Sequence, residues 1–505
     1  MVRSEQMGTR FDARAMASRA LVTPEAMGRA DARTIESGVP QRTLVARAAR
    51  ACFRIIRSRY PRQLVTILCG PGHNGEDGFV LGTLLAEAGW PVDVMRLDGE
   101  QPLDEERFGS LISKLRPTGV FAPDRGMIVV DALFGAGLSR PLEGEARTLV
   151  ERLEGSGATV VAIDLPSGID GTTGEVLGAA AQADATITFH RLKPGHLLGA
   201  GAERCGRVYL ADIGVQHDSG DTAAFWNDPV LWQQLLGAPE RDTHKYARGH
   251  VAVIGGPGLR GGAGRLAARA ASVSGAGAVT HFSPASAAEF AAAHFDAVMV
   301  RQVGDPEMLA DALGDRVGSV VMGPGMGHGE AAAARLDAVL RTRLPAVLDA
   351  DALTLHEDMP QAFYDQLHAG CVLTPHEGEF RRLFPGLQGD KLTRAEAAAR
   401  RCGATVLLKG ATTVIATPGA VPVLTTNGSP ALATAGSGDC LAGVIGGLLA
   451  RGIGPHEAAA MGAWIHAEAG RDAAPSLTAE ELPARIAGVF AALLRPGLDK
   501  PHGPI

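Results

Sequence analysis

The chain has 505 residues, with 48 Lys and Arg against 55 Asp and Glu, and its formal net charge is −7. This acidic balance disfavours non-specific binding to nucleic acid or to an anionic membrane surface, so we expect neither as a partner. At about 150 residues per domain the length allows roughly two to four domains, and the 65 glycines suit an α/β enzyme rich in loops.

The N-terminus carries no hydrophobic signal core, and no stretch reaches the length of a membrane span. We expect about the first 15 residues to be loosely held. The six cysteines are scattered without metal-ligand spacing, and several lie in apolar runs. They are predicted to be reduced thiols, as in a cytoplasmic protein.

Residues 24–57 form a polar segment with a helical pattern. Short apolar runs then alternate with helical stretches, which is typical of a doubly wound parallel sheet in an α/β fold. A helix is predicted at 79–88, and strands are predicted at 64–69, 92–97, 127–131, 159–164, 185–189 and 208–211. Such a sheet binds ligands at the carboxyl ends of its strands, where the conspicuous polar residues of this half fall.

Three of these polar residues, Asn74, Asp131 and Ser167, offer only oxygen atoms as metal ligands, from three neighbouring strand ends. Oxygen ligands suit a hard cation and not zinc. The alternative is that the three residues cap the helices that follow. The residues by themselves leave both interpretations open.

The segment 70–75 has the Gly-x-Gly-x-x-Gly spacing of a dinucleotide-binding loop, and Asp98 follows at a plausible distance. A single glycine pattern is weak, and Glu76 and Asp77 are poor neighbours for a pyrophosphate. The spacing recurs at 256–261, where no acidic residue lies about twenty residues further on. A dehydrogenase with two such domains is therefore an alternative.

A domain boundary is predicted near 216–245, where turn residues and prolines cluster. His244 and His250 have no acid or cysteine at ligand spacing, which favours a surface or packing role over metal binding. The strand–helix alternation then repeats, with a flexible loop expected at 255–264 and strands at 251–254, 320–322, 346–349 and 405–408.

The segment Gly436-Ser437-Gly438-Asp439 leads into an apolar run long enough for a buried helix. A glycine turn before a helix N-terminus binds anions, because the first-turn amides are unpaired and the helix dipole favours negative charge. Asp439 then has two interpretations. It is a helix cap, or it is a general base that takes a proton from a hydroxyl attacking a phosphoryl group.

Other strand ends in this half also carry charged residues. Asp349 and Asp351 either hold magnesium or cap the next helix, with neither favoured. Lys409 is either a phosphate-binding lysine or an ordinary strand-end charge. His376 does not begin a zinc-protease motif, because Phe380 stands where the second histidine is required.

Gly436–Asp439 resembles the Gly-Thr-Gly-Asp signature of the ribokinase-like kinases. With the segments 409–413 and 374–379, residues 225–495 are similar to one branch, the ADP/ATP-dependent NAD(P)H-hydrate dehydratases. In that family the signature amides stabilise the moving phosphoryl group. The resemblance implies Asp439 as the catalytic base, substrate contacts from Ala263, Gly325, His376 and Asp439, and a nucleotide site at Lys409, Gly410, Ala411, Thr412, Thr413, Gly436, Ser437 and Gly438.

Residues 20–220 resemble the NAD(P)H-hydrate epimerases, whose phosphate loop reads Gly-x-Gly-Asn-Asn-Gly-Gly-Asp-Gly. The resemblance implies a potassium ion at Asn74, Asp131 and Ser167, and it implies Asp164 as the acid/base group at C6 of the hydrated nicotinamide ring. It also implies substrate contacts from His73, Asn74, Gly75, Glu76, Asp77, Gly135, Ala136, Gly137, Leu138, Ser139, Arg140, Pro141 and Asp164.

The chain departs from the epimerase pattern at three places. His73 and Glu76 replace an Asn and a Gly, and 45–49 replaces the Met-Glu-x-Ala-Gly that the family usually shows. A carboxylate of Glu76 that pointed inward would repel a phosphorylated ligand by about 1 kcal/mol or more. Because the flanking residues match the family, we expect Glu76 to point outward.

The two resemblances predict a bifunctional enzyme, with a Rossmann-like epimerase domain over 1–222 and a ribokinase-like dehydratase domain over 223–505. Its expected substrates are the hydrates of NADH and NADPH, with ADP or ATP as co-substrate and potassium and magnesium as cations. We also expect a homo-oligomer. A vitamin or sugar kinase, and a non-catalytic binding protein on the N-terminal fold, are the alternatives.

Overall fold

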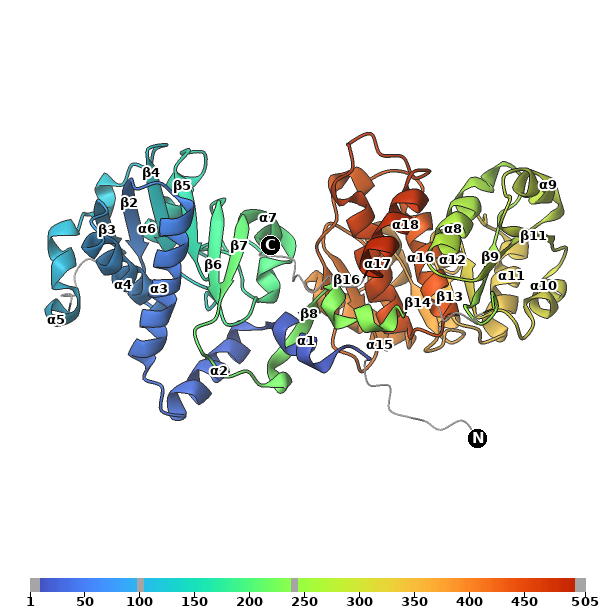
Figure 1. Ribbon diagram of the computed structural model, residues 1–505, viewed down its shortest axis with the longest axis horizontal. Helices are drawn as coiled ribbons and strands as arrows, with labels where there is room; N and C mark the ends of the chain where they lie inside the picture. Colours follow the sequence, from blue (N-terminus) through green and yellow to red (C-terminus); the bar gives the residue numbers. More distant parts are fainter. Residues whose placement is uncertain (1–9, 98–103, 238–243, 496–505) are drawn as a thin grey trace. The chain divides into compact units, whose positions relative to one another are not determined.

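The structure is a computed structural model that describes residues 10–97, 104–237 and 244–495 (Figure 1). It contains two compact units: Ala20–Ala224, called here the N-terminal unit, and residues 225–495 with residues 10–19, called here the C-terminal unit. Residues 1–9 and Asp98 lie outside the described residues. Within the described ranges, no helix is both long and apolar enough to cross a membrane.

The N-terminal unit is built on a six-stranded sheet in the order β3-β2-β4-β5-β6-β7, in which every pair of neighbours is parallel. The strands are β2 Leu64–Cys69, β3 Val92–Arg96, β4 Met127–Ala132, β5 Thr159–Ile163, β6 Ala185–Phe189 and β7 Arg207–Ala211. The main helices are α2 Pro24–Glu36, α3 Gln41–Arg59, α4 His73–Glu87, α5 Glu105–Phe108, α6 Gly144–Leu153 and α7 Gly199–Arg204. The doubly wound sheet expected for this half is confirmed.

Successive side chains of a strand point to opposite faces of its sheet, and β2 shows the consequence. Val65 and Ile67 join the apolar cluster formed with α3 and α4, whereas Leu68 joins a second cluster formed with α6. Helices therefore cover both faces of the sheet. Such a strand is apolar along its whole length, as the sequence of β2 is.

The strand order reverses at β2, because the chain passes from β2 to β3 on one side and later returns to place β4 on the other. Loops that leave the carboxyl ends of two such strands turn in opposite directions and open a crevice between them. The residues after Cys69 and after Ala132 therefore face a common space.

Helix α4 begins at His73, so the predicted start of this helix at Phe79 is wrong. Gly75 and Gly78 argue against a helix by propensity alone, at about 1 kcal/mol each. Packing decides the matter instead. A Cβ on Gly75 would lie 1.9 Å from the carbonyl oxygen of Gly70, and one on Gly78 would lie 2.8 Å from the Cβ of Ala132. Both glycines allow the first turns of α4 to lie directly against the sheet.

The C-terminal unit contains a long sheet in the order β8-β17-β16-β15-β14-β13-β12-β9-β10-β11, parallel except where β16 pairs with β15 and β17. Its strands are β8 Thr222–Trp226, β9 His250–Ile254, β10 Ala278–Ser283, β11 Met299–Gln302, β12 Ser319–Met322, β13 Ala346–Leu348, β14 Cys371–Leu373, β15 Thr405–Leu408, β16 Thr413–Ala416 and β17 Val423–Thr425. The helices are α1 Ala13–Arg19, α8 Gly262–Val273, α9 Ala285–Ala293, α10 Pro306–Leu313, α11 Glu330–Arg341, α12 Asp351–Thr354, α13 Pro360–Tyr364, α14 Glu377–Leu383, α15 Lys391–Cys402, α16 Ser437–Ala450, α17 Pro455–Arg471 and α18 Leu482–Leu493.

Helix α16 is the buried helix that the apolar run after Asp439 predicted. It packs against α8, α17 and β12. This packing requires glycine at two positions of α16. A Cβ on Gly443 would lie 2.2 Å from the carbonyl oxygen of Ala267, and one on Gly446 would lie 2.3 Å from the side chain of Val321. The close contacts fix the position of the N-terminus of α16.

The expected thiol state is also found. The six cysteines are free and buried, and none is paired with another.

Candidate active sites

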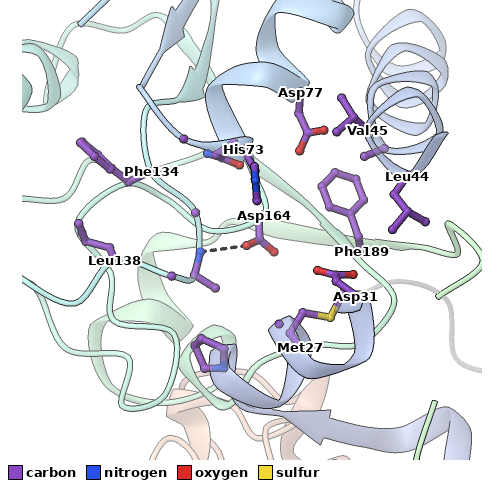
Figure 2. Close-up of a pocket in the computed structure, with 18 of the residues that line it drawn as sticks. Met27, Asp31, Leu44, Val45, His73, Asp77, Phe134, Leu138, Asp164 and Phe189 are labelled. Atoms are coloured by element: carbon purple, nitrogen blue, oxygen red, sulfur yellow. Dashed lines mark hydrogen bonds between the residues drawn. The ribbon is translucent and has the colours of Figure 1, made fainter. Parts of the chain in front are cut away.

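A cavity of about 640 Å³ opens at the strand-order reversal of the N-terminal unit (Figure 2). Its walls come from α2, α3, the first turn of α4 and the loop after β4. Among the residues predicted to touch substrate, the cavity is lined by His73, Asn74, Asp77, Gly135, Ala136, Gly137, Leu138, Ser139, Arg140 and Asp164. Gly75, Glu76 and Pro141 are not part of this lining.

Glu76 points away from the cavity, as expected. Its carboxylate forms an ion pair with Arg107, with 2.6 Å between Oε1 and Nη2. His73 does line the cavity, and its Nε2 lies 2.8 Å from the side-chain nitrogen of Gln41 on α3. Of the two departures from the epimerase loop, only His73 therefore faces the cavity.

The first turn of α4 presents unpaired backbone amides. Gly72 precedes the helix without a side-chain cap, and the first amide that pairs within the helix is that of Glu76. The amides of His73, Asn74 and Gly75 have no acceptor among the described residues. Unpaired amides at a helix N-terminus, where the dipole is positive, form an anion site.

Asp164 lies at the end of β5 with a left-handed backbone, φ 65°. Its Oδ1 accepts hydrogen bonds from Lys193 Nζ at 2.6 Å and from Thr188 Oγ1 at 2.9 Å. Its Oδ2 accepts one from the Ala136 amide at 2.9 Å, the dashed line in Figure 2. Burial alone would raise the pKa of Asp164, but the adjacent Lys193 ammonium and these hydrogen bonds hold the pKa lowered to about 2. This carboxylate is a fixed anion.

Two further carboxyl groups face the same cavity. Asp77 on α4 and Asp31 on α2 both line it, and neither accepts a hydrogen bond from a described residue. Burial raises the pKa of Asp77 well above its usual range, and the nearby charges of Asp164, Glu76 and Asp31 raise it further. Burial also raises the pKa of Asp31, partly offset by Lys193.

The structure brings Asp131 and Ser167 into contact beneath the cavity. The Ser167 hydroxyl donates to Asp131 Oδ1 at 2.6 Å, and the Ser167 amide donates to Oδ2 at 2.8 Å. Burial raises the pKa of Asp131. Asn74 lies beside the Gly135 loop, and its side-chain nitrogen is buried without a partner. The three predicted cation ligands thus come from adjacent strand ends.

In the C-terminal unit, the predicted anion site lies at the N-terminus of α16. Gly436 is the N-cap, with φ 90°, and Asp439 lies in the first turn rather than at the cap position. The Ser437 amide donates to the carbonyl of Thr434 at 3.2 Å, so it is not available to a ligand. The amides of Gly438 and Asp439 have no acceptor in the described ranges and remain available.

Lys409 lies next to this turn. Its Nζ lies 2.8 Å from Asp349 Oδ1 and 3.9 Å from Glu379 Oε2, and it is 3.3 Å from the position that a Cβ on Gly438 would occupy. Asp349 is almost fully buried. The lysine is therefore held by a buried carboxylate and lies close to the two unpaired amides.

Asp351 accepts a hydrogen bond from the Gly327 amide at 2.8 Å. Between the two aspartates, Ala350 has φ 48°, a left-handed conformation that costs a non-glycine residue about 1 kcal/mol or more. This strain lets Asp349 and Asp351 turn toward different partners. Burial and the charge of Asp349 raise the pKa of Asp439 to about 7, although Lys409 lowers it.

The remaining predicted residues fall into three groups. Gly325 and Ala263 are neighbours, since a Cβ on Gly325 would lie 3.3 Å from that of Ala263. The His376 ring caps α14 and lies 3.6 Å from Glu379. Gly410, Ala411 and Thr412 lie in the connection from β15 to β16, and Thr413 begins β16.

Sequence reasoning missed four charged residues of these sites. Asp31 gave no signal, because it lies in a polar helix without a motif. Lys193 and Glu379 lie in segments that drew attention for other residues. Lys391 holds the segment between β15 and β16, donating to the carbonyls of Lys409 at 2.9 Å and Thr412 at 2.6 Å. Burial lowers the pKa of Lys391 to about 8.

The sequence singled out His244 and His250, and both lie within the described ranges. His250 pairs through Nε2 with Thr280 Oγ1 at 2.8 Å, which fits the predicted packing role. In the part of the chain that the structure describes, no group of three or more His, Cys, Asp or Glu side chains is arranged to hold a metal.

Comparison with known proteins identifies both halves of the chain. The NAD(P)H-hydrate dehydratase family profile matches residues 251–489, and the profile described as the YjeF-related protein N-terminus matches residues 41–195. A solved ADP/ATP-dependent NAD(P)H-hydrate dehydratase from Bacillus subtilis, co-crystallised with ATP and Mg²⁺, is 26% identical with a TM-score of 0.45, covering 52% of this chain and 98% of that chain.

Full-length relatives match nearly the whole chain. The bifunctional NAD(P)H-hydrate repair enzyme of Synechocystis sp. is 35% identical over 484 residues, covering 90% of each chain. The enzyme of the same name from Coxiella burnetii is 34% identical, covering 87% of this chain and 92% of the relative. The chain belongs to the family of bifunctional NAD(P)H-hydrate repair enzymes.

Proposed function

We propose that the protein returns hydrated NADH and NADPH to the reduced cofactors in two steps. The N-terminal unit interconverts the R and S hydrates, and the C-terminal unit dehydrates the S form at the expense of ADP or ATP. Family membership supports both activities, since one family profile matches within each unit. One observation carries the dehydratase assignment: Asp439 lies beside a lysine and two unpaired amides at the N-terminus of a buried helix.

In the dehydratase, Asp439 takes the proton of the C6 hydroxyl as its oxygen attacks the terminal phosphoryl group of the nucleotide. A pKa of about 7 suits this role, because a general base works best when its pKa is near the operating pH. The amides of Gly438 and Asp439, with Lys409, stabilise charge on the moving phosphoryl group. Phosphate then leaves C6 as a C5 proton is lost, which restores the 5,6 double bond.

A magnesium ion would accompany the nucleotide in this proposal. Asp349 and Asp351 offer the hard oxygen ligands that magnesium prefers, next to the turn that receives the phosphates. The ion would neutralise phosphate charge when bound. Lys409 and the 410–413 loop, held in place by Lys391, would contact the nucleotide.

In the epimerase, the unpaired amides of α4 and the loop after β4 would receive the phosphates of the hydrate, and the cavity would receive its ring. Asp164 would contact the substrate as a fixed anion. Its low pKa and three hydrogen-bond donors favour an anchoring role over the predicted role in proton transfer.

The residues predicted to hold potassium fit a monovalent cation. Asp131 is a buried carboxylate whose hydrogen-bond donors are the Ser167 hydroxyl and backbone amides, all neutral. A buried charge without a charged partner is costly, and a cation would compensate it. The unpartnered amide of Asn74 can turn its oxygen toward such an ion. Potassium would hold the loops after β2, β4 and β5 together.

The test is a repair assay with both hydrates. The protein is incubated with separated R and S epimers, with ADP or ATP, and the return of the dihydronicotinamide absorbance is followed. Recovery from both epimers supports both activities, whereas recovery from the S form alone removes the epimerase assignment. If the protein instead consumes nucleotide and releases a phosphorylated product, and the dihydronicotinamide absorbance does not return, the protein is a kinase.

A further inference from the structure

Three carboxyl groups are turned toward one space in the cavity of the N-terminal unit, and they are not equivalent (Figure 2). Both oxygens of Asp164 are occupied by donors from Lys193, Thr188 and Ala136. Asp31 and Asp77 accept no hydrogen bond and form no ion pair within the described part of the chain. A carboxyl group that transfers protons needs an oxygen free to meet the substrate, and only these two have one.

We propose that Asp31 and Asp77 are the acid–base pair of epimerisation and that Asp164 is a positioning residue. This inference rests on the epimerase function proposed above. Asp31 comes from α2 and Asp77 from α4, so the two groups reach the cavity from different elements. In Figure 2 the Phe189 ring is seen between them. Two proton-transfer groups in separate positions suit a reaction that exchanges the two faces of a ring carbon.

The chemistry balances without any further reactant. The protonated member of the pair, assigned as Asp77, gives its proton to the C6 hydroxyl. The C6–O bond breaks, water leaves, and the lone pair of the adjacent ring nitrogen forms a double bond to C6. A water molecule then adds to C6 from the opposite face and gives its proton to the Asp31 carboxylate, while the electron pair returns to nitrogen.

One turnover leaves Asp77 ionised and Asp31 protonated, which is the state needed to convert the other epimer back.

The surroundings of Asp31 and Asp77 favour one proton shared between the two carboxyl groups. Burial raises the pKa of both groups, and the negative charge of Asp31 raises that of Asp77 further. Like charges that face one cavity do not both ionise readily, so one member is an acid while the other is a base. The Asp164 carboxylate raises the pKa of Asp77, whereas the Lys193 ammonium lowers that of Asp31, which favours Asp77 as the protonated member.

The experiment measures epimerisation of purified S and R hydrates by the full-length protein without nucleotide, so that no dehydration follows. Asp31→Asn and Asp77→Asn are compared with Glu36→Gln on α2 and Glu87→Gln on α4, which are exposed and outside the cavity. The kcat of each Asp variant is expected to fall about 10²–10⁴-fold, with little change in KM. The control variants are expected to epimerise at the wild-type rate. Circular dichroism and melting curves verify folding.

Isotope labelling distinguishes the proposed role of Asp31 and Asp77 in cleavage of the C6–O bond from a purely structural role. In H₂¹⁸O, the wild-type enzyme should place one ¹⁸O at C6 per epimerisation, above the exchange without enzyme. In D₂O it should place no deuterium at C6. Deuterium at C6 without ¹⁸O, or full rates in both folded Asp variants, would overturn the proposal while the epimerase function stands. A wild-type protein that leaves both epimers unchanged would overturn both.

Discussion

Replacement of Asp439 by Asn tests the dehydratase site most directly, because it removes the base while preserving the shape of the side chain. Loss of a positioned general base lowers a rate by about 10²–10⁴, or roughly 3–5 kcal/mol of barrier. The R and S hydrates should still interconvert, since epimerisation takes place in the other unit. The dehydration rate is followed by dihydronicotinamide absorbance with the S hydrate and saturating ADP.

The pH dependence of the wild-type enzyme supplies a second measurement. With a pKa of about 7, Asp439 is about one-tenth ionised at pH 6 and about nine-tenths ionised at pH 8. If the ionised form is the base, kcat/KM should rise about tenfold between these pH values. The low residual rate of Asp439→Asn should not show this rise. Asp472→Asn, an exposed residue near the end of α17, serves as the control.

Stability should move in the opposite direction from activity. The folded-state pKa of Asp439 lies above its ordinary value of 3.8, mainly because burial disfavours the charged form. Between about pH 4 and pH 7 the unfolded chain releases a proton that the folded side chain keeps, so the stability of the wild-type fold falls progressively as pH rises. At about 1.4 kcal/mol per pH unit, Asp439→Asn should gain up to about 4 kcal/mol at pH 8 and nothing below pH 4.

Denaturant unfolding at pH 4 and pH 8 measures this gain. A variant that dehydrates at a near-normal rate would refute the assignment of Asp439 as base. A variant that is inactive but less stable at pH 8 would show that the carboxylate is a structural group, and the argument from its burial would be wrong.

Three further outcomes are expected. Replacing potassium by choline should slow epimerisation and leave the affinity for ADP unchanged, and rates indifferent to the exchange would contradict the cation site. Glu76→Gly should keep the epimerase KM within about twofold, because a partly exposed ion pair with Arg107 contributes at most about 1 kcal/mol. Lys391→Ala should raise the KM for nucleotide about tenfold, since hydrogen bonds of about 1 kcal/mol each hold the loop; initial rates at varied ADP measure this change.

The strands β2 to β7, and β9, β12, β13 and β15, could be predicted from the sequence, because strands buried on both faces are continuous apolar runs. The strands β8, β10, β11, β14, β16 and β17 were missed. The start of α4 could not be predicted either. Its glycines weaken a helix by local propensity, and only the contacts of Gly75 and Gly78 with the sheet explain why they occur there. Tertiary packing overrides propensity at this position.

Some of the site residues could likewise be predicted from the sequence, and others could not. Asp439, Lys409 and Asp164 lie at strand ends or in a glycine turn, where sequence patterns are informative. Asp31 lies in an amphipathic helix, and its carboxyl group becomes notable only when the fold places it opposite Asp164 in a shared cavity. The hydrogen bond from the Ser437 amide to the Thr434 carbonyl likewise depends on the backbone geometry of the turn. That geometry could not be predicted from the residue types.

The two sites share an arrangement that explains how a buried carboxyl group becomes a proton carrier. In each unit a lysine neutralises one strand-end aspartate, Lys193 with Asp164 at 2.6 Å and Lys409 with Asp349 at 2.8 Å. In the N-terminal unit, Lys193 and hydrogen bonds hold the pKa of Asp164 lowered to about 2, so this paired aspartate is a fixed anion. A second carboxyl group lies nearby, Asp439 in one unit and Asp77 in the other, and neither forms a hydrogen bond or ion pair with a described residue. Burial and the charge of the paired aspartate both raise the pKa of this second group. The charge of the lysine-paired aspartate raises the pKa of the second carboxyl group, and this second group gains and loses the proton.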